Sequence, residues 1–121
     1  MELVNLTPHA VDICDDHGQV RLTITANPTP ARVVVDRYEL PGIEVEGLSI
    51  PLHRTEAHGV SDLPLARPDT MFIVASAVAA ASDRGDLIVP DELVRDDRGT
   101  VVGCRSFAVL FRSVDRAEAA P

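Results

Sequence analysis

The segment 68–107 constrains the fold most, because strand, helix and hairpin signals follow one another there without a gap. Residues 71–74 form a buried-type apolar run, and the Ala-rich stretch 76–82 predicts a short helix. The polar corner 83–86 precedes a second apolar run, 87–89, which we expect to end at Pro90. A hairpin with its turn at residues 96–99 follows.

The first part of the chain shows the period of two that is typical of strands. Residues 10–14 and 20–24 alternate on either side of the polar turn 15–18, which predicts a hairpin. After a proline-rich loop at 27–30, the β-branched residues in 31–35 predict another strand.

The middle of the chain is broken by proline and glycine. We expect a turn at residues 38–42 and then a hairpin made by 43–46 and 48–52, with Gly47 between them. Residues 54–68 have weak periodicity and two prolines, which predicts a long surface loop.

These signals predict a mainly β (α+β) fold, a small antiparallel barrel or sandwich with one short helix. The chain has 121 residues, enough for one core, and only 3% are aromatic, so Val, Leu, Ile and Ala must fill it. We expect a single β-rich domain over residues 1–112. Residues 113–121 are rich in alanine and charge without an apolar pattern, which predicts a disordered C-terminal tail.

The charge of the chain excludes several partners. The formal net charge is −8, and all eleven basic residues are arginines. An acidic surface without a basic stripe argues against nucleic-acid binding. No apolar run is long enough to span a bilayer, and no signal peptide is visible, so we expect no membrane association and a cytoplasmic location with reduced thiols.

Two groups of residues resemble a known group of proteins. The opening Asn-Leu-Thr-Pro-His at 5–9 is similar to that of short uncharacterised proteins from actinobacteria and their phages. So is the later pattern formed by residues 71–76, 84–86, Pro90, 94–96, Gly99 and 103–104. The resemblance covers most of residues 3–107, and it implies origin and single-domain character without implying a mechanism.

The best candidate binding site is made of arginines and aspartates in the polar corners. If the corner 83–86 and the turn 96–99 meet at one end of the sheet, Arg84 and Arg95 can hold a carboxylate or phosphate with two parallel hydrogen bonds. The predicted ligand-binding residues are His9, Arg54, Arg84, Asp86 and Arg95. The alternative is that these are turn residues and surface ion pairs, which contribute little stability.

Two other clusters suggest chemistry. His9, Cys14, His17 and Cys104 are ligand types that suit zinc, but no Cys-x-x-Cys or paired-histidine spacing is present, so we predict no metal and no cofactor. Cys104 fits a small core residue, because its neighbour Arg105 should point to the opposite face of a strand.

His53 with Asp62 is a possible general-base pair, but the sequence lacks a Gly-x-Ser-x-Gly nucleophile motif and, without lysine, a phosphate loop. We therefore assign no catalytic residue.

The sequence favours a non-enzymatic, homo-oligomeric binding module, of a phage-related kind, that binds a small anionic, nucleotide-like molecule or a protein partner. One alternative is a small hydrolase or transferase that uses a histidine with an aspartate or a metal. Another is a structural subunit of an oligomeric assembly that is joined through edge strands.

Overall fold

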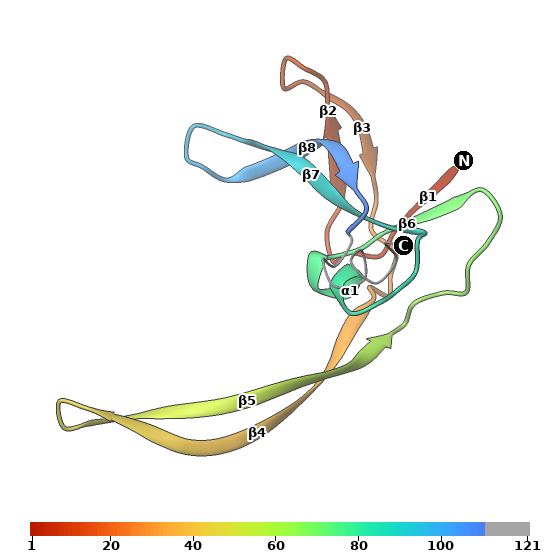
Figure 1. Cartoon of the computed structure of the whole chain (residues 1–121). Coiled ribbons are helices and arrows are strands. Elements are labelled where there is room, and N and C mark those ends of the chain that lie inside the picture. Colours follow the sequence, from red (N-terminus) through yellow and green to blue (C-terminus); the bar gives the residue numbers. More distant parts are fainter. Residues whose placement is uncertain (111–121) are drawn as a thin grey trace, which may run out of the picture.

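The computed structural model describes residues 1–110, which form a six-stranded sheet, a separate two-stranded hairpin and one short helix (Figure 1). The elements in chain order are β1 (Glu2–Asn5), β2 (Val11–Cys14), β3 (Val20–Ile24), β4 (Arg32–Val45), β5 (Leu48–Ser61), β6 (Thr70–Ile73), α1 (Ser76–Ala80), β7 (Leu87–Arg95) and β8 (Val101–Ala108). The predicted tail at 113–121, and the last two residues of the predicted domain 1–112, lie outside the described residues.

The six-stranded sheet is mixed, with the strand order β1-β6-β7-β8-β2-β3. The pairs β1–β6, β6–β7 and β2–β8 are parallel, whereas β7–β8 and β2–β3 are antiparallel. The mainly β class with one short helix is confirmed. The sheet is not wholly antiparallel, and its strands end in an open order, so a closed barrel or a sandwich is not confirmed.

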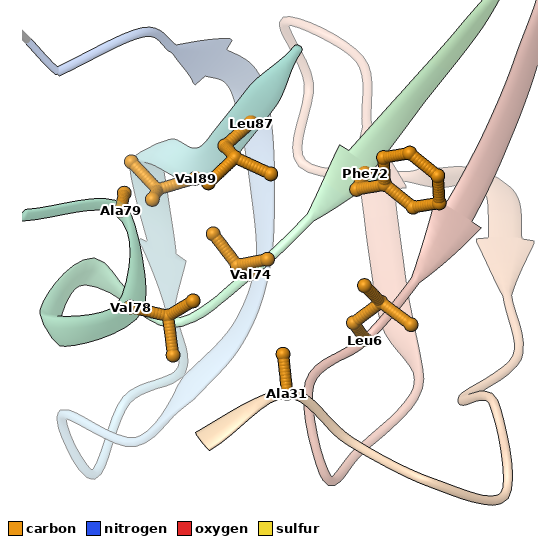
Figure 2. Close-up of a cluster of buried hydrophobic side chains, with 8 residues drawn as sticks. All are labelled: Leu6, Ala31, Phe72, Val74, Val78, Ala79, Leu87 and Val89. Atoms are coloured by element: carbon orange, nitrogen blue, oxygen red, sulfur yellow. The ribbon is translucent and has the colours of Figure 1, made fainter. Parts of the chain in front are cut away.

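The core lies on both faces of the central parallel strands. Residues 71–73 of β6 and 87–89 of β7 are continuous apolar runs, as expected where parallel strands are covered on both sides. Helix α1 covers one face, where Figure 2 shows the first cluster: Leu6, Ala31, Phe72, Val74, Val78, Ala79, Leu87 and Val89. The second cluster contains Ile73 and Ile88 from these strands, together with Val11 and Cys104 from β2 and β8.

Three of the predicted features are found where the sequence placed them. The helix lies within the predicted range, and the hairpins around 15–18 and 96–99 are formed by β2–β3 and β7–β8. The predicted strand end at Pro90 is wrong, because β7 continues to Arg95. Strand β6 pairs with β7 only as far as Ile88, so the nitrogen of Pro90 faces a side of β7 without a neighbouring strand, where proline is tolerated.

The most unexpected element is the hairpin of β4 and β5, here called the arm. Each strand has 14 residues, which corresponds to a length of about 45 Å. The arm extends away from the sheet (Figure 1), and its contacts with the first core cluster come from Val33 and Val60 at its base. Nearly all of its other residues are exposed.

The predicted turn at 38–42 is wrong, and a β-bulge explains why. Leu40 pairs with Leu52 and Ile43 pairs with Ile50, so two residues of β4 lie opposite the single residue Pro51. Such a bulge keeps the strand continuous through Pro41 and Gly42. The turn between the strands is Glu46–Gly47, where both residues have positive φ, as in the two-residue turns that match strand twist.

The predicted surface loop at 54–68 is also wrong over its first half, because β5 runs to Ser61. This part of the strand has no buried partner on either face except near its end. It therefore lacks the apolar alternation by which a strand is recognised.

Candidate functional site

The predicted anion site is not assembled, because Arg84 is already engaged. Its Nε and Nη2 donate hydrogen bonds of 2.9 and 2.6 Å to the two carboxylate oxygens of Asp86. Its Nη1 donates to the carbonyl of Pro64, and the guanidinium lies 5.5 Å from the centre of the Phe72 ring. The hydrogen bond with Asp86 raises the pKa of Arg84 and lowers the pKa of Asp86. The ion pair of Arg84 and Asp86 therefore fixes the turn that leads into β7.

Arg95 lies at the other end of the same strand. Arg84 precedes β7 and Arg95 is the last of its nine residues, so the strand separates them by about 26 Å. The Nη1 of Arg95 donates a 2.8 Å hydrogen bond to the carbonyl of Gly99 in its own hairpin turn. The predicted clamp of two arginines is therefore not formed.

Arg54 and the proposed histidine base both lie on the arm. Arg54 is opposite Tyr38 in the register, and the Nδ1 of His53 lies 3.2 Å from the Nη2 of Arg37. Asp62 follows the end of β5, so on an extended chain it is on the order of 30 Å from His53. The structure does not form the pair of His53 and Asp62.

His9 belongs to a loop that a buried asparagine organises. The side chain of Asn5, only 2% exposed, donates from Nδ2 to the carbonyls of His9 and Ile24 at 2.8 and 3.0 Å. Its Oδ1 accepts from the amide and the hydroxyl of Thr7 at 3.0 and 2.7 Å. The Asn-Leu-Thr-Pro-His opening therefore serves to fix the chain between β1 and β2.

Beside this loop lies a half-open pocket of about 580 Å³, here called the β7–β8 pocket. Its lining residues are mostly apolar and come from the start of β2 and from β7 and β8: His9, Ala10, Val11, Asp12, Pro90, Leu93, Val101, Val102, Gly103 and Cys104. Of the five predicted ligand-binding residues, only His9 lines it. The lining favours an apolar occupant over a small anion.

The two cysteines near this pocket, Cys14 and Cys104, are not activated as nucleophiles. Cys104 is a core residue, as predicted, and burial, together with the neighbouring Cys14, raises the pKa of its thiol. Cys14 is also buried, and its sulfur lies against Gly103 of β8. Within residues 1–110, no group of three or more His, Cys, Asp or Glu side chains is close enough to hold a metal ion.

The arm carries a second candidate surface, which the sequence reading missed. Paired residues of a hairpin share a face, and the bulge at 41–42 keeps the apolar pairs in phase across it. One face of the outer arm, here called the apolar arm face, carries seven exposed large side chains: Tyr38, Leu40, Ile43, Val45, Leu48, Ile50 and Leu52. Arg54, which pairs with Tyr38, shares this face at the end nearer the body. The opposite face is polar: Arg37, Glu39, Glu44, Ser49, His53 and Thr55. The signal was present in the alternation of 48–52, but the spacing of Leu40 and Ile43 concealed its continuation.

Comparison with known proteins does not assign the chain to a family. No family model, no curated protein and no solved structure matches the chain. Across the part of the chain that the structure describes, no helix is long and apolar enough to cross a membrane.

Proposed function

We propose that this protein is a structural subunit of a homo-oligomeric assembly and that its arm makes the contact between copies. The observation that carries the proposal is the apolar arm face, seven large side chains exposed on a ribbon that the body does not cover. Together they expose on the order of 500 Å² of apolar surface, the size of the largest apolar patches on monomeric proteins, which are often binding surfaces.

An isolated two-stranded hairpin also needs a partner for stability. Such ribbons are marginally stable in water unless their apolar face packs against another element. If each arm meets an equal area on a neighbouring copy, a contact buries about 1,000 Å² in total, the lower bound for a specific protein interface. The opposite, polar face then remains in water, which fits its charged residues.

This proposal selects among the functions that the sequence left open. A protein partner suits the apolar arm face, whereas the small-anion version loses support because Asp86 already neutralises Arg84. The resemblance to short actinobacterial and phage proteins is compatible with an assembly subunit and remains a prediction.

The test is the mass of the protein in solution, measured by light scattering during size-exclusion chromatography. We expect the unaltered protein to be oligomeric. The double variant Ile43→Asp/Ile50→Asp, which places two carboxylates on the apolar arm face, should be monomeric. Ser49→Asp, on the polar face of the same arm, is the matched control and should keep the oligomeric mass. A monomeric unaltered protein at its highest soluble concentration contradicts the proposal.

A further inference from the structure

The proposed assembly needs an acceptor for the arm, and the β7–β8 pocket has suitable chemistry. Leu93, Val101 and Val102 form part of its wall and are 47%, 44% and 42% exposed. Its volume of about 580 Å³ lies within the range of pockets that enclose ligands, and its lining is mainly apolar. It therefore suits a cluster of aliphatic side chains.

The tip of the arm presents such a cluster. Leu48 is 64% exposed, the highest value on the apolar arm face, and Val45 pairs with it directly across the ribbon. The turn at Glu46 and Gly47 contains only two residues, so the tip is a narrow wedge with both aliphatic side chains on one face.

The tip cannot fill the pocket of its own chain. The base of the arm packs on the first core cluster beside α1, whereas the pocket lies on β2, β7 and β8. Figure 1 shows the arm and the β7–β8 hairpin extending in different directions from the body. Because the arm is a continuous ribbon about 45 Å long, the tip reaches a pocket only on another copy.

Charge also favours this contact. The tip carries two carboxylates, Glu44 and Glu46. Arg95 pairs with Val101 at the pocket wall, and its Nη1 donates to the carbonyl of Gly99 in the adjoining turn. Arg95 has no ion-pair partner among residues 1–110, so its charge can attract an acidic tip, while Asp12 is the one carboxylate in the pocket lining.

From these observations we infer, resting on the proposed assembly role, that the arm tip of one copy inserts Val45 and Leu48 into the β7–β8 pocket of the next copy. The two surfaces in this contact differ, so the contact is head-to-tail. Repetition of a head-to-tail contact generates a ring, or a filament where the rotation does not close.

Two single variants and their mixture test the inference. Leu48→Asp alters the tip and leaves the pocket intact, whereas Val102→Asp alters the pocket and leaves the tip intact. Each variant alone should be monomeric. An equimolar mixture should form a one-to-one heterodimer, because the intact tip of the Val102→Asp protein meets the intact pocket of the Leu48→Asp protein. Light scattering of the mixture measures this mass.

The controls separate insertion from folding and from the wider proposal. Val20→Asp places the same charge at an equally exposed position on β3 outside the pocket and should leave the oligomer unchanged. Far-ultraviolet circular dichroism checks that each variant is folded, and Val102→Glu replaces Val102→Asp if the latter is not. An oligomeric pocket variant, or a mixture that stays monomeric, overturns the insertion but leaves the assembly role intact. A monomeric unaltered protein overturns both.

Discussion

Replacement of Asn5 by alanine should be the most destabilising exchange of a single polar side chain in the β1–β2 connection. The amide makes four hydrogen bonds, and the residue is 2% exposed, so water cannot replace them without opening the loop. At a net value near 1 kcal/mol for each bond, and with partners left unsatisfied, the expected loss is about 3–4 kcal/mol.

This loss is a large part of the stability of a domain of this size, which is typically about 5–15 kcal/mol. It corresponds to a fall in the melting temperature of about 12–16 °C. Urea unfolding followed by circular dichroism measures the difference. All variants are compared at one protein concentration, because the proposed assembly would add to apparent stability.

Two further variants make the result interpretable. Asn5→Asp keeps both accepted hydrogen bonds but removes both donors and buries a charge, so it should lose at least as much stability as Asn5→Ala. Asn27→Ala is the control, because the exposed Oδ1 of Asn27 accepts one hydrogen bond, from the amide of Thr29, and its loss should be about 1 kcal/mol or less. If Asn5→Ala is no more destabilising than Asn27→Ala, the assignment of Asn5 as the organising residue is refuted.

Two other predictions concern the packing and the charges of the body. Gly103→Ala should destabilise the fold by about 2 kcal/mol. The added Cβ would lie 2.7 Å from the Cys14 sulfur and 2.9 Å from the Asp12 carbonyl oxygen. Gly85→Ala is the control and should be neutral, because no atom lies within 4 Å of the added Cβ. Equal urea midpoints for the two would contradict this. Since the pKa of Asp86 is lowered in the folded state, its contribution is complete above the unfolded value, about 3.9, and is lost as the pH falls through the folded value. Asp86→Asn should therefore weaken the acid dependence of the unfolding free energy, and an unchanged slope would count against the pairing with Arg84.

The sequence was most informative where one face of a strand is buried. The β2–β3 and β7–β8 hairpins and helix α1 were predicted because their apolar spacing and turn residues agree with each other. Strand direction was not predictable, since the parallel pairing of β1 with β6 depends on contacts between residues nearly 70 positions apart.

The predictions of the turn within the arm and of the anion site were wrong for a related reason. A bulge inserts one residue and breaks the period of two, so Pro41 and Gly42 resembled a turn although the ribbon passes through them. The two arginine corners looked like partners because both are polar turns, but the length of β7 separates them. Only the continuation of β7 through Pro90 determines that distance, and proline in the sequence argued against it.

The arm joins the body through very few side chains, and this gives it freedom to change in length. Val33 and Val60 lie at its base, so residue pairs farther out can be gained or lost without removing a core contact. Each added or removed residue pair changes the length of the arm by about 3.3 Å. Changes of two pairs at a time keep the apolar side chains on the same face of the ribbon. The reach of the arm can therefore change in evolution while the body that carries it stays the same.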